Sequence, residues 1–211
     1  MVVQYSGLRL TNPADKLPAI SALAEILRRG NQQQYLAGLW GDSLLVDMCW
    51  ELERPFPWIP QWRAPTWSWA SVDGPITYHQ GLYVREGPVE QRFQVVNAEC
   101  SLADPSPTGR VLDGFVKLSC ILVSVHLHPT INIKLVAGTE ELYWRNDGRR
   151  MLKELRDLYI IPLVTVAEST KCLVVTPKDR GQPDMVRVGL AGGWKSLCDS
   201  WEKERRTVRI V

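Results

Sequence analysis

The stretch RAPTWSWASVDGP, residues 63–75, decides how the two halves of this 211-residue chain are joined. In an extended backbone, alternation places Trp67 and Trp69 on one face and small side chains on the other. Two indole rings on one face need a thick apolar cover, and each buried indole N–H needs an acceptor. The nearest source of cover is an amphipathic run over residues 42–52. We therefore predict a tryptophan brace between a helical part and a β part, with a recognition surface as the alternative.

The sequence before this block is helical in pattern. Asn12 followed by Pro13 is a typical N-cap and first helical position, although Pro18 moves the start of the helix a few residues later. Gly30 marks its end, and its apolar stripe consists of Leu17, Ile20, Leu23, Ala24 and Leu27. Asp42 is expected to cap a second helix, whose stripe consists of Leu44, Leu45, Met48, Cys49 and Leu52.

The sequence after this second helix is typical of a proline-rich loop and then of β structure. Prolines at positions 55, 57, 60 and 65 exclude a helix interior over residues 55–66. Short runs rich in Val, Ile, Leu and Tyr then predict strands at Trp67–Val72, Ile76–Tyr78, Arg92–Leu102, Val111–His128, Ile131–Val136, Tyr159–Val166, Cys172–Thr176, Met185–Leu190 and Thr207–Val211. A short helical turn is expected at Lys153–Leu158, and a glycine-rich turn at Gly189–Trp194.

These patterns together predict an α+β fold, with two N-terminal helices packed on a mainly antiparallel β barrel or sandwich. Along the chain we expect a helical segment over residues 1–54, a proline-rich loop over 55–66 and a β-rich domain over 67–211. The helices and the β-rich domain are expected to form one compact unit.

Composition is that of an ordinary globular protein, with 45% hydrophobic and 23% charged residues. The 25 basic and 23 acidic residues leave a net charge of +2, so no strong field draws the chain to nucleic acid or to an anionic membrane. No apolar run reaches the roughly 18 residues of a membrane span, and the N-terminal sequence lacks the features of a signal peptide. The five cysteines are scattered and odd in number, which favours reduced thiols. We expect a cytoplasmic chain with neither a membrane nor a nucleic acid as partner.

Motifs for metal, cofactor and covalent chemistry are weak. His126 and His128 share one face of a predicted strand, but that strand carries no cysteine or carboxylate near them, so no metal site is expected. Neither a phosphate-binding glycine loop nor a nucleophile elbow occurs, and no cofactor is expected. The alternative of a hydrolase-like enzyme would place its site near Asp73 and His79, with Arg63, in a polar cleft.

A second alternative is a β-barrel binding module for nucleic acid or a small ligand. The densest basic cluster consists of Arg145, Arg149, Arg150 and Lys153, beside Trp144. Because acidic residues are interleaved with it, a solvated face of mixed charge is the favoured interpretation.

Two blocks carry a resemblance to a known family. YLAGLWGDSLLVDMCW (35–50) and RAPTWSWASVDGPITY (63–78) resemble the region that follows the core of fungal heterokaryon-incompatibility (HET) proteins. The opening stretch YSGLRLTNPADKLPAISALAEIL is similar to the end of that core, where the step Asp15-Lys16-Leu17 opens a helix, and the closing strands resemble the family's carboxyl ends. The positions that match the family motif are Trp40, Asp42, Arg63, Pro65, Trp67, Trp69, Asp73 and Gly74.

The resemblance implies a role in fungal non-self recognition and programmed cell death. The serine/tyrosine-cysteine-tryptophan-glycine signature of the family's core does not occur in this sequence. Any NAD cleavage would reside in that core, which has been likened to the TIR fold, so no catalytic residue is carried over. We expect a non-enzymatic accessory or scaffold region. Its core is either missing because the reading frame is truncated, or is supplied by a partner chain.

Overall fold

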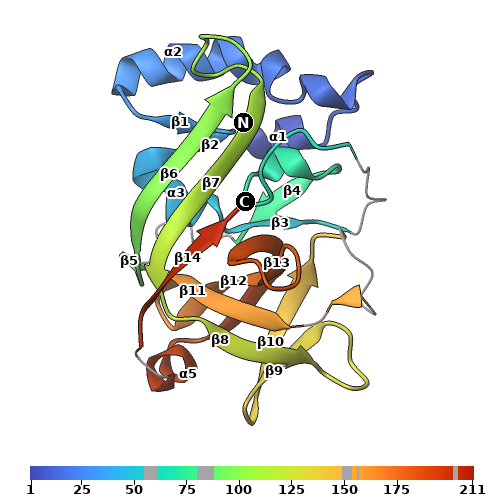
Figure 1. Ribbon diagram of the computed structural model, residues 1–211, viewed down its shortest axis with the longest axis vertical. Helices are drawn as coiled ribbons and strands as arrows, with labels where there is room; N and C mark the ends of the chain where they lie inside the picture. The colour runs from blue at the N-terminus through green and yellow to red at the C-terminus, as the bar shows by residue number, and fades with distance from the viewer. Residues whose placement is uncertain (55–60, 80–87, 149–153, 156, 202–203) are drawn as a thin grey trace.

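The computed structural model describes residues 1–54, 61–79, 88–148, 154–155, 157–201 and 204–211 (Figure 1). Its centre is a closed antiparallel barrel of six strands, in the order β8, β9, β10, β13, β12, β11 and back to β8. The strands are β8 (Val123–Leu127), β9 (Lys134–Ala137), β10 (Glu140–Asn146), β11 (Leu158–Val166), β12 (Ser169–Pro177) and β13 (Asp184–Trp194). The predicted α+β fold is confirmed, and of the two β architectures expected the chain adopts the barrel.

Four further strands extend the barrel sheet toward the helical end of the molecule. They are β5 (Val89–Gln91), β6 (Gln94–Leu102), β7 (Val111–Cys120) and β14 (Arg206–Ile210). β14 pairs in parallel with β13, β7 pairs with β14, β6 with β7, and β5 with β11. In Figure 1 the long β6–β7 hairpin runs from the barrel up to α2, so one sheet connects both ends of the molecule.

The N-terminal part consists of short elements that pack above the barrel (Figure 1). They are α1 (Val2–Ser6), η1 (Pro13–Asp15), η2 (Pro18–Ile20), α2 (Ser21–Asn31), β1 (Tyr35–Leu36), β2 (Leu39–Trp40), η3 (Gly41–Ser43), α3 (Leu44–Asp47), β3 (Trp50–Leu52), η4 (Trp69–Ser71) and β4 (Ile76–Tyr78). A last helix, α5 (Lys195–Ser200), follows β13.

The first helix begins later than its capping signal indicates. The Asn12 side chain accepts a hydrogen bond from the Ala14 amide, but it caps only the 3-10 turn η1. Pro18 opens a second 3-10 turn, and α2 starts at Ser21, as the position of Pro18 predicts. α2 ends at Asn31 rather than at Gly30, and the following residue, Gln32, takes the left-handed conformation with φ 53°.

The second predicted helix is mostly wrong. Only residues 44–47 are α-helical, and residues 50–52 form β3, which pairs with β4. Asp42 lies exposed in the 3-10 turn η3 and does not cap the helix. Asp47 ties this segment together instead, because its carboxylate accepts from the Trp40 amide and from the Ser43 hydroxyl.

The strand expected at Trp67–Val72 is also wrong, because this segment is a turn followed by the 3-10 helix η4. The Ser68 hydroxyl accepts from the Ala70 amide, a local bond that competes with a strand ladder. Two other differences lie in the barrel. β10 was not predicted, and the strand expected over Val111–His128 divides into β7 and β8.

The glycine-rich turn predicted at Gly189–Trp194 is the continuation of β13. The glycines serve packing, because a Cβ on Gly189 would lie 2.9 Å from the Trp144 ring and 2.3 Å from the Arg145 carbonyl oxygen. The expected helical turn at Lys153–Leu158 and the prolines at 55, 57 and 60 lie outside the described residues, wholly or in part.

Strand alternation produces two separate hydrophobic clusters. Ile160 and Val174 face the barrel interior, together with Trp144. Ile161 and Leu173, one residue along each strand, face the helical end and pack with the tryptophan block. The outer face of the barrel strands therefore packs against the N-terminal part.

Candidate functional site

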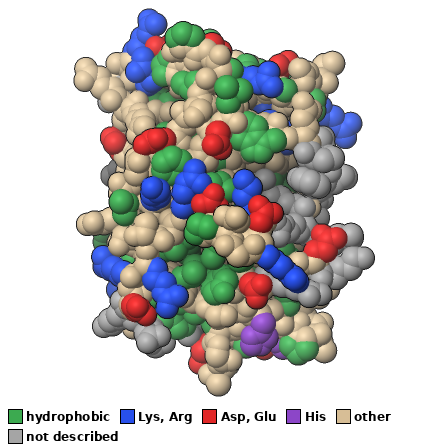
Figure 2. All heavy atoms as spheres, in the orientation of Figure 1, with side chains coloured by type: hydrophobic (Ala, Val, Ile, Leu, Met, Phe, Trp, Pro, Cys, Tyr) green, Lys and Arg blue, Asp and Glu red, His purple; other side chains and the backbone are tan. Residues whose placement is uncertain are grey.

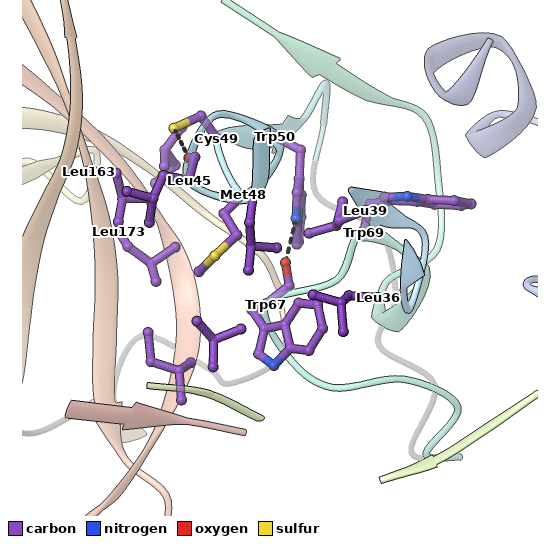
Figure 3. Packing of buried hydrophobic residues seen from close by; sticks show 14 of the residues in the cluster. Leu36, Leu39, Leu45, Met48, Cys49, Trp50, Trp67, Trp69, Leu163 and Leu173 are labelled. Atoms are coloured by element: carbon purple, nitrogen blue, oxygen red, sulfur yellow. Dashed lines mark hydrogen bonds between the residues drawn. The ribbon is translucent and has the colours of Figure 1, made fainter. Parts of the chain in front are cut away.

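Three tryptophans form the centre of the second cluster. Trp50, Trp67 and Trp69 are each 0% exposed. Figure 3 shows Trp50 donating its indole N–H to the Trp67 carbonyl, at 3.0 Å. Trp69 donates to the Gly38 carbonyl at 2.9 Å, whereas the Trp67 indole N–H has no hydrogen-bond partner among the described residues. These rings are core, as the predicted brace requires, and do not form a recognition surface.

The cover over these rings comes from two short strands and α3. Leu36 and Leu39 lie beside Trp67 and Trp69, and Met48, which follows α3, fills the side toward the barrel (Figure 3). The Gly38 backbone has φ +94°, and a Cβ there would lie 2.7 Å from the Trp69 indole nitrogen. Only glycine allows the backbone to approach the ring this closely.

A wholly buried arginine of the barrel anchors this cluster. Arg187 of β13 pairs with Asp147 at 2.7 Å, and both side chains are at most 1% exposed. The same guanidinium donates to the carbonyls of Met48 (2.6 Å) and Trp50 (2.5 Å). Neither Arg187 nor Asp147 was predicted from the sequence as a site residue. The only signal was a charge within an otherwise apolar strand, MVRVGL.

Direct hydrogen bonds and side-chain packing hold the chain between Arg63 and Thr66 against the barrel sheet. The Thr66 amide donates to the Val211 carbonyl at 3.1 Å, and its hydroxyl accepts from the Arg187 amide at 3.0 Å. Pro65 packs on β7, where a Cβ on Gly114 would lie 2.8 Å from its ring. Thus both motif residues, Arg63 and Pro65, lie in a segment that joins the tryptophan block to three strands.

Two motif residues form an ion pair beside the tryptophans. Arg63 is buried, donates to the Ala70 carbonyl at 2.7 Å and pairs with Asp73 at 2.7 Å. Gly74 follows with φ +95° and turns the chain toward β4. Arg63 Nη1 and Asp73 Oδ2 are buried and lack a hydrogen-bond partner within the described part of the chain.

Lys16, from the family-like Asp15-Lys16-Leu17 step, joins this pair. Its side chain is buried, donates to the Val72 carbonyl at 2.5 Å and lies 5.5 Å from the centroid of the Trp69 ring. Burial lowers the pKa of Lys16 to about 8, with a smaller contribution from Arg63, while Asp73 acts in the opposite direction. A cavity of about 430 Å³ opens at Lys16 and Asp73.

The other two motif residues lie apart from this group. Trp40 is half-buried and packs edge-on against Tyr35, with ring centroids 5.1 Å apart. Asp42 is exposed. The motif thus contains two neighbourhoods, one around the buried tryptophans and one around the start of α3.

The hydrolase alternative depends on Asp73 and His79 sharing a cleft. His79 is exposed after β4 and is not among the described residues that line the cavity with Asp73. Ser68 donates to the Ala37 carbonyl and Ser71 to the Ser68 carbonyl, so both hydroxyls are engaged with backbone.

The residues considered for metal and nucleic acid also have local partners. His128 contacts Glu141 at 3.1 Å, and no group of three or more His, Cys, Asp or Glu in the described residues is arranged to hold a metal ion. Trp144 is buried in the barrel, and Arg145 pairs with Glu51 at 3.0 Å. Arg149, Arg150 and Lys153 lie outside the described residues.

Cys49, Cys100 and Cys120 are not in disulfide bonds. Burial raises the thiol pKa of Cys49, Cys100 and Cys120 to about 12. Within the same segments, no helix has the length and apolar character needed to cross a membrane.

Comparison of the chain with family models, with curated proteins and with solved structures returns no match. The resemblance to HET proteins therefore stays a prediction from the sequence.

Proposed function

We propose that this chain is the accessory region of a HET-like protein and acts as a non-catalytic scaffold that docks the effector core. In this proposal it works in the cytoplasm of a fungal cell, in non-self recognition and programmed cell death. The core is either part of a longer polypeptide or supplied by a partner chain.

The observation that carries the proposal is an apolar row left exposed on α2. Leu23, Ile26 and Leu27 are 43%, 68% and 38% exposed, at the i, i+3, i+4 spacing of one helix face. All five residues of the apolar stripe were expected to be buried. Leu17, Ile20 and Ala24 are buried, whereas Leu23 and Leu27 are exposed. In Figure 2 hydrophobic side chains reach the surface at the upper end of the molecule, where Figure 1 places α2. A contiguous apolar row on an otherwise amphipathic helix is typical of a protein-binding surface.

Two further observations support a core as the occupant. The row lies in the stretch that resembles the end of the HET core, so a core would continue directly from this surface. The tryptophan block meanwhile forms a rigid support, because Trp69 donates to the Gly38 carbonyl and Lys16 donates to the Val72 carbonyl. A rigid support with one apolar face is what a docking scaffold needs.

The test begins with the 5′ end of the transcript, sequenced through the genomic region upstream of Met1. We expect a HET core encoded in frame or in a neighbouring reading frame. That core, expressed as a separate chain, should bind residues 1–211 in isothermal titration calorimetry. The triple variant L23Q/I26Q/L27Q should weaken binding at least tenfold, whereas Leu112→Gln, at another exposed leucine, should leave it unchanged.

Two outcomes would overturn the proposal. One is the absence of any HET core, encoded at this locus or elsewhere in the genome, that binds residues 1–211. The other is a core that binds the triple variant as tightly as the parent chain, while circular dichroism shows that both are folded.

A further inference from the structure

The cavity beside Lys16 is bounded by two segments far apart in the sequence. Residues 5–10 and Pro13 form one side, and residues 73–75 form the other, with Lys16 and Arg54 completing the lining. Its volume of about 430 Å³ falls in the range of small-molecule sites. Tyr5, Leu8 and Pro75 give it apolar walls.

The charges buried next to the cavity do not balance. The side chains of Lys16 and Arg63 are both buried, and the carboxylate beside them is that of Asp73, which already pairs with Arg63 at 2.7 Å. Two buried cations that share one carboxylate leave an excess positive charge, and such a charge is costly unless it is paired.

Hydrogen-bonding capacity is left over in the same place. An ammonium group has three donors, and within the described residues the acceptor found for Lys16 Nζ is the Val72 carbonyl. Arg63 Nη1 and Asp73 Oδ2 are buried and unpartnered within those residues too. Lys16 and Asp73 line the cavity and Arg63 lies behind Asp73, so a ligand or water in the cavity can complete the hydrogen bonds of the lining atoms.

The mouth of the cavity adds charge of the same sign. Arg9 and Arg54 line it, and the one carboxylate in the lining is Asp73. A site with three cationic side chains, one of them buried, attracts anions and strengthens their binding where water is excluded.

We propose that this cavity binds a small organic anion, whose phosphate or carboxylate group pairs with Lys16 while its apolar part lies against Tyr5, Leu8 and Pro75. The buried excess charge and the unused donors point to the anionic group. The volume and the apolar walls point to a ligand larger than an inorganic ion. This site is separate from the exposed row of α2 and does not depend on the docking of a core.

The protonation state of Lys16 gives the proposal a second readout. Because its pKa is about 8, it is mostly charged at pH 7 and mostly neutral at pH 9.5. The other charged groups that line the cavity are Arg9, Arg54 and Asp73, and Arg63 lies beside it, paired with Asp73. Burial raises the pKa of Tyr5. Affinity for an anion should therefore fall as the pH rises from 7 to 9.5.

The experiment titrates the full chain with phenyl phosphate, with benzoate and with the uncharged benzyl alcohol, by calorimetry at pH 7. We expect one or both anions to bind at least tenfold more tightly than benzyl alcohol, and the comparison of the two anions identifies the preferred group. Lys16→Met should reduce anion affinity at least tenfold. Arg9→Met, at an exposed position of the mouth, should reduce it several-fold without affecting folding. Arg110→Met, at an exposed arginine outside the cavity lining, is the matched control.

Equal binding of all three probes would overturn the proposal, and so would anion binding that neither Lys16→Met nor Arg9→Met changes. Absence of binding by both anions up to about 10 mM would overturn it as well. Anion affinity that stays constant between pH 7 and pH 9.5 would show that the anion does not pair with Lys16, and would also overturn the proposal.

Discussion

The guanidinium carbon of Arg187 lies 3.3 Å from the centroid of the Trp50 ring, and neither side chain is exposed to solvent. The same guanidinium donates to the Trp50 carbonyl, so one barrel residue contacts both the ring and the backbone of Trp50. A stacked arginine with its charge paired and its donors used is the residue type best suited to a dry interface. The barrel and the tryptophan block are therefore joined by polar bonds as well as by apolar packing.

Replacement of Arg187 tests this junction. Arg187→Met should lower the free energy of unfolding by about 3–5 kcal/mol, because it leaves the buried Asp147 carboxylate without its partner. Urea denaturation measures the loss. Arg206→Met, at an exposed position, should change stability by less than about 0.5 kcal/mol. Equal midpoints for the two variants would show that the buried ion pair contributes no net stability.

The two tryptophans of the motif should differ in what their indole nitrogens contribute. Either Trp67→Ala or Trp69→Ala should cost about 3–5 kcal/mol, since both rings are wholly buried. The phenylalanine variants separate packing from hydrogen bonding. Trp69→Phe should cost about 1–3 kcal/mol more than Trp67→Phe, because it leaves the Gly38 carbonyl without its donor. Thermal and urea unfolding of the four variants measure the difference, and a larger cost for Trp67→Phe would contradict it.

Two glycines should respond to alanine in opposite directions. Gly38→Ala should destabilise by about 1–3 kcal/mol or more, because the new Cβ meets the Trp69 ring and the backbone has a positive φ. Gly30→Ala lies in α2 with nothing within 4 Å of the new Cβ, and should stabilise by about 0.5–1 kcal/mol. The melting temperature should therefore fall for Gly38→Ala and rise for Gly30→Ala, relative to the parent chain. A neutral Gly38→Ala would show that the backbone can withdraw from the ring.

Stability should depend on alkaline pH through Lys16. Its pKa is about 8 in the folded chain against 10.5 for the free side chain, so the unfolded chain binds more protons between these values. This group therefore makes the folded state more stable as the pH rises through that window, by on the order of 1 kcal/mol between pH 8 and pH 9.

The buried thiols act in the opposite direction above pH 9, because they ionise first in the unfolded chain. Urea unfolding of the parent chain and of Lys16→Met at pH 7.5, 8 and 9 isolates the lysine. We expect the stability of the variant, relative to the parent, to decrease over this interval. A constant difference would show that Lys16 has an ordinary pKa.

Much of the barrel was predictable because its signal is local. The apolar runs within LYIIPLVTV and STKCLVVTP, rich in Val, Ile, Leu and Tyr, predict strands whose ends lie within three residues of those of β11 and β12. β10 was missed because its sequence, EELYWRN, is polar on the outward face and has few β-branched residues. The turn predicted at Gly189–Trp194 was wrong because Gly189 makes room for the ring of Trp144, some 45 residues away in sequence, and does not mark a turn.

In the candidate site, too, some features could be predicted from the sequence and others could not. The burial of Trp67 and Trp69 could be predicted from ring size and local composition. Their backbone could not, because Ser68 and Trp69 bind the carbonyls of Ala37 and Gly38, 31 residues earlier. The pairing of Lys16 with Val72 spans 56 residues and that of Arg187 with Asp147 spans 40, and no local period marks such contacts.

The bond between Arg187 and Thr66 also has a consequence for how the protein is made. These residues are 121 positions apart, so the tryptophan-rich segment leaves the ribosome long before the strand that completes its surroundings. At ordinary rates of translation the delay is on the order of 10 seconds. During that time the indoles of Trp50, Trp67 and Trp69 lack the barrel strands that bury them, and exposed apolar surface of this kind is prone to aggregation.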